Sequence, residues 1–299
     1  MNVGAARAFW MGSVRAFRNW RLWLVFYLIN FVFAAILTIP IASLVSSDLS
    51  NRLVGQELLS GFCYRWYVEF AHGNAPFFSA LLPQIVFLIV LYILVDVFLA
   101  GGFFTSFAAS EKVKIGVFLS NGSTKFFDIL LVTLIEVALL MGLYKLNSLF
   151  DLIGGTASNR IVATHGLWRV GFWRYAVLLV LFGVINILSD FSKAAMALDD
   201  DTFLSKLTRG VTFVIRHPLS TGGVYIGATI LSTAVIAAAF LPARFVPSSG
   251  EAGILVEVAA GQIIVLLRIF SKLIFYAGEA VLYKENQIEV IKVKPEMLE

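Results

Sequence analysis

Six long apolar runs constrain the fold of this chain more than any other feature. A membrane-spanning helix needs about 20 mostly apolar residues, because about 30 Å of hydrocarbon is crossed at about 1.5 Å per residue. The runs lie at about residues 22–46, 81–108, 126–150, 172–197, 219–241 and 254–283. Each is continuous, whereas the strands of a membrane barrel alternate over about ten residues. The sequence therefore predicts an all-α polytopic membrane bundle of six transmembrane helices.

The composition predicts the lipid bilayer as the main partner. Hydrophobic residues make up 59% of the 299 residues and charged residues 14%, whereas soluble domains are about 45–50% apolar and about 25% charged. The formal net charge of +4 comes from basic residues that cluster beside the apolar runs. Because they do not form one basic patch, nucleic acid is not an expected partner.

The distribution of lysine and arginine predicts the topology. The N-terminal segment, the second and fourth connections and the C-terminal segment together carry twice as many basic residues as the remaining connections. Basic residues favour the cytoplasmic side of a membrane. We therefore expect both termini in the cytoplasm, with the first apolar run retained as a span because it is too long for a signal peptide.

Three connections on this basic side have the pattern of interfacial amphipathic helices. The apolar positions before the first and fifth spans are Phe9, Trp10, Val14, Phe17, Phe203, Leu204, Leu207, Val211 and Val214. Before the fifth span, the carboxylates of residues 199–201 are expected to cap the helix, and Lys206 and Arg209 to face water. A shorter surface helix before the third span is expected to end at Asn121-Gly122.

The chain is predicted to be a single membrane domain, residues 1–299, with a possible three-fold pseudo-repeat. The units would be 1–109, 110–199 and 200–299, each a surface helix followed by a two-span hairpin. Arg18 and Tyr27 match Arg216 and Tyr225 at one common offset. Coincidence in a small alphabet is the alternative explanation.

Ionisable residues inside the spans are the candidate functional residues. Each costs about 2.5–3.5 kcal/mol on insertion scales, so each needs an explanation. They are Asp96, Glu136, Asp190, Arg268, Lys272 and Glu279. The last three lie on one stripe of the sixth span at helical spacing, and this stripe is expected to face the bundle interior.

The expected depths of these residues predict specific ion pairs. Arg268 should pair with Asp96 or Glu136, and Lys272 should pair with Asp190. One interpretation is a set of static pairs that fix the helix register. The alternative is a pathway for an ion, a proton or an anionic headgroup.

The fifth span holds no ionisable residue and has the pattern of a packing helix. Gly223 and Gly227 have the small-xxx-small spacing that allows a close approach of helices. The catalytic signatures of metalloproteases, serine hydrolases and P-loop proteins are absent from the sequence. The three histidines are far apart and Cys63 is the only cysteine, so no catalytic residue and no metal site is predicted.

Three stretches carry a resemblance to a known group of proteins. They run from Asn19 to Pro40, from Asp190 to Tyr225 and from Gln262 to Tyr283. Together they resemble a widespread group of uncharacterised bacterial six-span inner-membrane proteins and, more distantly, the membrane domain that accompanies some glycerophosphodiester phosphodiesterases. The group has an acidic residue at the end of the fourth span, as Asp190 would be here. It also has an arginine and an F-Y-A motif in the sixth span, as Arg268 and residues 275–277 would be.

The resemblance implies an architecture and a bacterial inner membrane, and no established activity. The phosphodiesterase catalytic domain has no counterpart in this chain. The sequence thus favours a non-catalytic integral membrane protein, an accessory or scaffold subunit of a larger membrane complex. The alternative is a transporter of a small solute, an ion or a lipid that uses the charged stripe of the sixth span.

Overall fold

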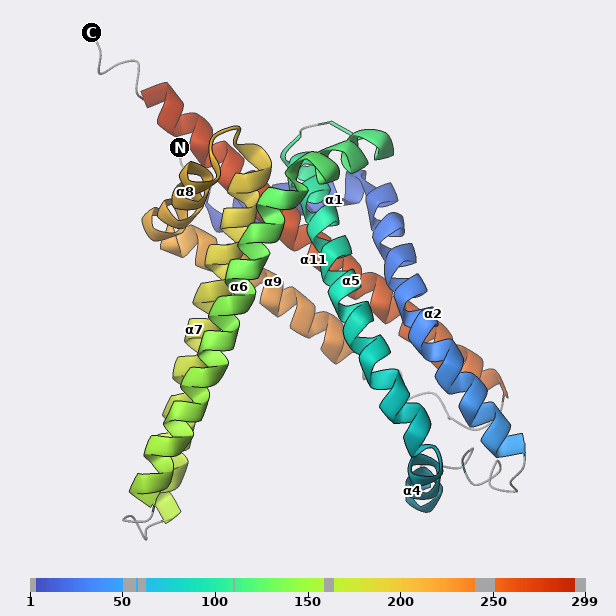
Figure 1. The fold of residues 1–299 in the computed structure, drawn as a ribbon. Helices are drawn as coiled ribbons and strands as arrows, with labels where there is room; N and C mark the ends of the chain where they lie inside the picture. Colours follow the sequence, from blue (N-terminus) through green and yellow to red (C-terminus); the bar gives the residue numbers. More distant parts are fainter. Residues whose placement is uncertain are drawn as a thin grey trace. The chain divides into compact units, whose positions relative to one another are not determined.

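The computed structural model of the chain describes residues 4–50, 58, 63–109, 111–158, 164–239 and 251–293. These residues are almost entirely helical, and none of them forms a strand. The helices in chain order are α1 (Ala5–Arg18), α2 (Trp20–Ser50), α4 (Tyr64–Gly73), α5 (Ala75–Ala108), α6 (Ile115–Ser158), α7 (Thr164–Leu198), α8 (Phe203–Arg216), α9 (Pro218–Ala239) and α11 (Glu251–Val293) (Figure 1). The all-α prediction is confirmed.

Six of these helices are long and apolar enough to cross a membrane. They are α2, α5, α6, α7, α9 and α11, over Trp20–Ser50, Ala75–Ala108, Ile115–Ser148, Trp173–Leu198, Pro218–Ala238 and Leu255–Gln287. Large apolar side chains such as Phe87, Phe127 and Leu179 are exposed along them, as expected for helices that contact lipid. The protein is therefore a multi-pass integral membrane protein, and the six-span prediction is confirmed.

The chain forms two compact units, each described by itself. Unit 1 contains Met1–Gly12, Val97–Tyr225 and Tyr276–Glu299, and unit 2 contains Ser13–Asp96 and Ile226–Phe275. The helices α1, α5, α9 and α11 each contribute residues to both units.

Aromatic side chains form the core of unit 1. Phe103 packs against Phe118 of α6 with ring centroids 5.1 Å apart, and Phe104 packs edge-on against Tyr276 of α11 at 5.2 Å. Phe213 of α8 contacts Tyr283 of α11 at 5.0 Å. Because lipid is as apolar as these rings, packing contacts rather than transfer from water hold them together.

Glycine allows α5 and α6 to approach closely within unit 1. A Cβ atom at Gly122 would lie 2.6 Å from the carbonyl oxygen of Phe98, and one at Gly102 would lie 2.6 Å from the ring of Phe118. The prediction that the surface helix ends at Asn121-Gly122 is wrong, because α6 is continuous from Ile115 through this position. The expected surface helix before the third span is the first part of α6.

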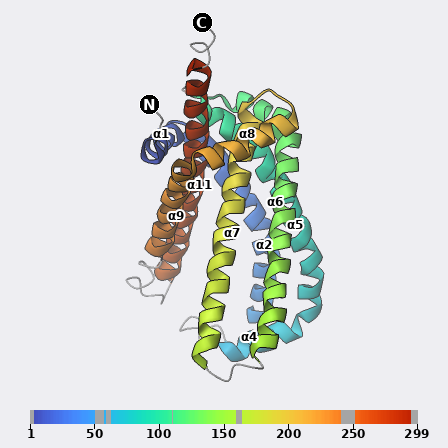
Figure 2. The same ribbon diagram turned by 90° about the vertical axis from the view of Figure 1, so that its left-hand side faces the viewer.

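The α8 helix forms before the fifth span as predicted, and it lies crosswise at the end of α6 and α7 (Figure 2). The predicted contact of Lys206 with water and the predicted caps are wrong, whereas Arg209 is exposed as expected. The N-cap is Thr202, and its side chain makes no capping hydrogen bond. Lys206 is only 6% exposed, and its Nζ donates a hydrogen bond to Asp128 Oδ2 of α6 at 2.7 Å. The helix packs against α7, so the lysine side of α8 faces protein.

Asp199 joins the end of α7 to two other helices of unit 1. Its buried carboxylate accepts hydrogen bonds from the Tyr283 hydroxyl at 2.9 Å and from Gln287 Nε2 at 3.2 Å, both on α11. Arg209 of α8 forms ion pairs with Asp199 at 3.7 Å and with Asp201. The acidic connection therefore anchors α8 and α11 to α7 instead of capping α8.

The exposed side of this connection contacts α6. Lys125 Nζ donates a hydrogen bond to Asp200 Oδ1 at 3.0 Å. This hydrogen bond lowers the pKa of the Asp200 carboxyl below its ordinary value.

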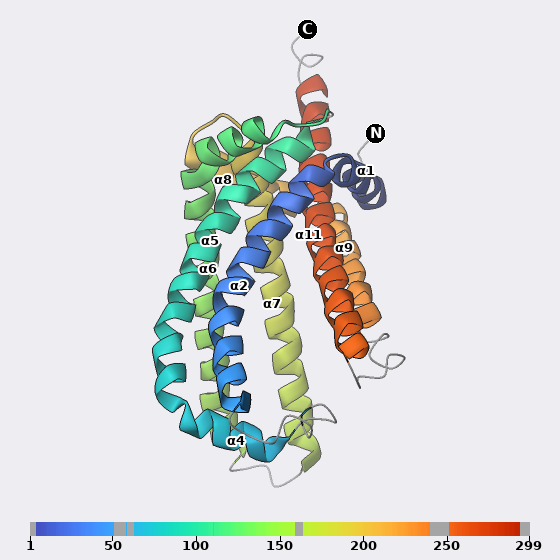
Figure 3. The same ribbon diagram turned by 90° about the vertical axis from the view of Figure 1, so that its right-hand side faces the viewer.

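Within unit 2, α2 and α11 run antiparallel and share polar contacts. Trp23 Nε1 donates to the Leu266 carbonyl oxygen at 3.1 Å, and the Tyr27 hydroxyl donates to Gln262 Oε1 at 2.8 Å. The short helix α4 lies at the end of the hairpin formed by α2 and α5 (Figure 3), where Trp66 Nε1 donates to Asp48 at 2.9 Å.

We predict that Lys206→Ala destabilises the protein. The substitution leaves the Asp128 carboxylate without its 2.7 Å partner, which costs about 1–3 kcal/mol. The melting temperature in mild detergent should fall, whereas Lys112→Ala, at an exposed position outside the helices, should leave it unchanged. Equal melting temperatures for both variants would mean that Lys206 faces water.

Candidate functional site

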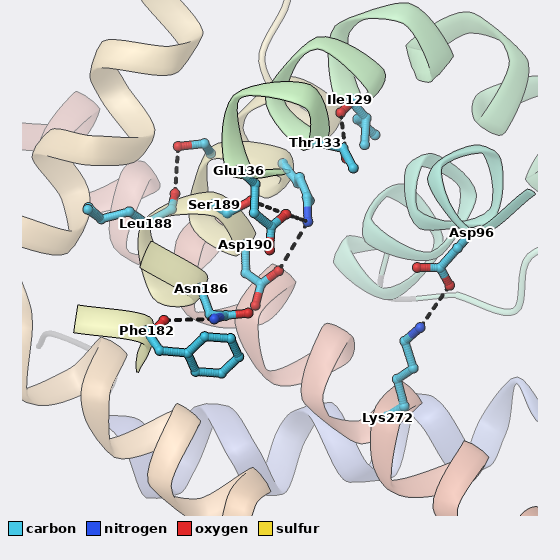
Figure 4. Close-up of polar contacts among 12 residues, drawn as sticks. Asp96, Ile129, Thr133, Glu136, Phe182, Asn186, Leu188, Ser189, Asp190 and Lys272 are labelled. Atoms are coloured by element: carbon cyan, nitrogen blue, oxygen red, sulfur yellow. Dashed lines mark hydrogen bonds and ion pairs between the residues drawn. The ribbon is translucent and has the colours of Figure 1, made fainter. Parts of the chain in front are cut away.

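Of the six candidate residues within the spans, two lie together in unit 2 and three lie together in unit 1. Unit 2 holds a single pair, in which Lys272 Nζ of α11 donates to Asp96 Oδ1 of α5 at 2.7 Å (Figure 4). The lysine ammonium also lies 5.1 Å from the ring centroid of Phe26, within the range of a cation–π interaction. One acid thus faces one base, and both side chains are about one third exposed.

The predicted ion pairs differ from those in the structure. Lys272 pairs with Asp96 and not with Asp190, which belongs to the other unit. Arg268 takes part in none of the ion pairs among the described residues, and it is exposed. Although Arg268 is one helical turn from Lys272, the spacing alone did not show which of the two side chains reaches α5.

Unit 1 holds a larger group, centred on Lys193 of α7. Its Nζ lies 2.6 Å from Glu136 Oε2 of α6 and 3.6 Å from Asp190 Oδ1, three residues earlier on α7. The Ser189 hydroxyl donates a second hydrogen bond to Glu136 Oε2 at 2.7 Å (Figure 4). The side chains of the two acids and the lysine are each 14% exposed.

Glu279 of α11 adds a third carboxyl group to this cluster. It is 1% exposed, and it interacts electrostatically with Asp190 and Lys193. Its Oε2 atom has no hydrogen-bond partner in the part of the chain that the structure describes. The hydroxyl of Tyr225 on α9 lies within electrostatic range of all three acids. We call Glu136, Asp190, Lys193 and Glu279 the acidic cluster.

The four side chains of the acidic cluster are three carboxyl groups and one ammonium group, and all four belong to helices long and apolar enough to span a membrane. An ionised carboxylate in a low-dielectric interior is costly unless it is paired and hydrogen-bonded. Glu279 meets this condition least well, because its side chain is buried and its Oε2 atom has no hydrogen-bond partner among the described residues.

Sequence reasoning found the three acids of the cluster but missed its centre. Lys193 had been grouped with the basic residues that set the topology, although it follows Asp190 by three residues. This spacing places two side chains on the same side of a helix, and it is the signal that pointed to the pair. Nothing in the sequence brought Ser189 to the cluster.

The predicted packing glycines belong to different units. A Cβ atom at Gly223 would lie 2.7 Å from the side chain of Ala5 on α1, within unit 1. Gly227 follows one turn later in unit 2 and is half-buried. Gly223 therefore allows α9 to approach α1 closely within unit 1.

Among the described residues, no group of three or more histidine, cysteine, aspartate or glutamate side chains has the geometry of a metal site. No family model, no curated protein and no solved structure matches this chain.

We predict that the Asp96–Lys272 pair is a static contact. Replacing either residue by alanine leaves one charge within the span without its partner, which costs more than replacing both. A double-mutant cycle of SDS-induced unfolding should give a coupling energy of about 0.5–3 kcal/mol. Strictly additive losses would contradict a direct pair.

Proposed function

We propose that this membrane protein is a transporter whose acidic cluster takes up a positive charge during its cycle. The observation that supports the proposal is the buried carboxyl group of Glu279, whose Oε2 has no hydrogen-bond partner among the described residues. It belongs to the same cluster as the ion pairs of Lys193 with Glu136 and Asp190. Intramembrane ionisable residues that face a bundle interior mark ion pathways and proton relays in transport proteins.

The contrast between the two units argues against a purely structural role for the cluster. Fixing the register of two helices requires only one acid and one base, as Asp96 and Lys272 show in unit 2. In the acidic cluster, Lys193 and Glu136 at 2.6 Å already supply such a pair. Glu279 adds a buried carboxyl group that a static contact does not need. A site that binds and releases a positive charge does need such a group.

The proposal includes a location and an orientation. The excess of basic residues in alternate connections supports cytoplasmic termini. The resemblance of three stretches of the sequence supports a bacterial inner membrane as the location. Asp190 and Glu279 lie toward the C-terminal ends of α7 and α11. The cluster would therefore lie nearer the cytoplasmic side of the bilayer than the middle of the spans.

The proposal is tested by measuring charge movement in proteoliposomes on a solid-supported membrane. A rapid jump of pH, of sodium concentration or of potassium concentration is applied in turn. At least one of the three should give a transient current in the wild type. Glu279→Gln should lower this current several-fold, because it removes the group that lacks a hydrogen-bond partner. Glu257→Gln, the same change at an exposed position of the same helix, should leave the current unchanged.

The opposite result has a definite meaning. If no ion jump gives a current above that of empty liposomes, the transport proposal is wrong. The protein is then better described as a non-catalytic accessory or scaffold subunit.

A further inference from the structure

We infer that the positive charge taken up by the acidic cluster is a proton, and that Glu279 carries it. This inference rests on the proposed function and names the ion that the site binds. It is drawn from the position of Lys193 and from the surroundings of the Glu279 carboxyl group.

Lys193 occupies the place that a metal cation would need. Its ammonium lies between Glu136 at 2.6 Å and Asp190 at 3.6 Å, so a cation bound by these carboxylates would have to displace it. Hard cations such as Ca²⁺ and Mg²⁺ also require about six or more oxygen ligands around them. A proton requires one oxygen atom, and the lysine stays in place.

Glu279 is the carboxyl group best suited to hold this proton. Glu136 already has partners of its own, because Lys193 Nζ lies 2.6 Å from its Oε2 and the Ser189 hydroxyl donates to the same atom. Glu279 is 1% exposed, and its Oε2 receives no hydrogen bond from the described residues. Two carboxyl groups at one site retain a proton between them because both cannot easily ionise, and Asp190 is the neighbouring acid.

The step itself is the reversible formation of one O–H bond. A proton from water adds to a carboxylate oxygen of Glu279, and no other covalent bond forms or breaks. The negative charge carried by Glu279 falls by one, and Lys193 keeps its contacts with Glu136 and Asp190. The titratable groups that face Glu279 are Asp190 and Lys193 of α7, with Tyr225 of α9 and Glu136 of α6 beside them.

Infrared difference spectroscopy across a pH titration tests the inference on the full chain in lipid nanodiscs. A protonated carboxyl group has a C=O stretching band that a carboxylate lacks. We expect a titrating band in the wild type and in Glu257→Gln, and its loss in Glu279→Gln. An unchanged band in Glu279→Gln, or no titrating band in the wild type, would overturn the inference.

A second variant keeps the test independent of folding. Glu279→Asp retains the carboxyl group but shortens the side chain by one methylene, so the band should remain at a shifted frequency. Monodisperse elution and unchanged helical circular dichroism establish that each variant is folded. If Glu279→Gln does not fold, an unshifted band in Glu279→Asp overturns the inference, because the titrating group would then be another carboxyl.

The two proposals fail in different ways. Currents that follow sodium or potassium jumps but not pH jumps would overturn the proton assignment and leave the transport proposal standing. A titrating Glu279 band without any current would overturn transport and leave the proton site standing.

Discussion

Hydrocarbon offers no hydrogen-bond partners to the polar groups that cross it. The backbone of this protein meets that constraint with six apolar helices, α2, α5, α6, α7, α9 and α11, because a helix pairs most of its peptide groups within the same segment. The side chains meet it less uniformly. Most are apolar and contact lipid or one another, and several of the ionisable ones are brought together in two groups.

The two groups meet the same constraint in different ways. In unit 2, Asp96 and Lys272 neutralise each other at 2.7 Å, and the result is a local contact between α5 and α11. In unit 1, Glu136 and Lys193 form a pair of similar length, but the cluster also holds the buried carboxyl group of Glu279, whose Oε2 atom has no hydrogen-bond partner among the described residues. A carboxyl group in these surroundings gains by binding a positive charge, which is the physical basis of the transport proposal.

The position of Glu279 depends on contacts outside the membrane-spanning part of α7. Tyr283 follows Glu279 by one helical turn, and its hydroxyl donates a hydrogen bond to Asp199, one residue beyond α7. The Asp199 carboxylate also accepts a hydrogen bond from Gln287 and forms an ion pair with Arg209 of α8. The surface helix α8 and the acidic connection therefore hold α11 against α7 where the cluster forms.

The sequence by itself determined the class of the protein. Runs of more than 20 apolar residues fit only membrane-spanning helices, since periodicity and length are properties of a single segment. It also identified five of the ionisable residues that pair or cluster within the spans, because their cost in lipid does not depend on their neighbours; these are Asp96, Glu136, Asp190, Lys272 and Glu279. The amphipathic patterns of α1 and α8 were likewise visible in the sequence.

Only the tertiary structure decided which of these residues meet. Helical spacing shows which side of a helix a residue lies on, but not which helix faces that side. Lys272 was therefore predicted to pair with Asp190 instead of Asp96, and Lys206 was predicted to face water. Lys193 was missed because its role depends on Glu136, which is 57 residues away. For the same reason Asn121-Gly122 was taken as a break, although Gly122 serves the close approach of α6 to the backbone of α5.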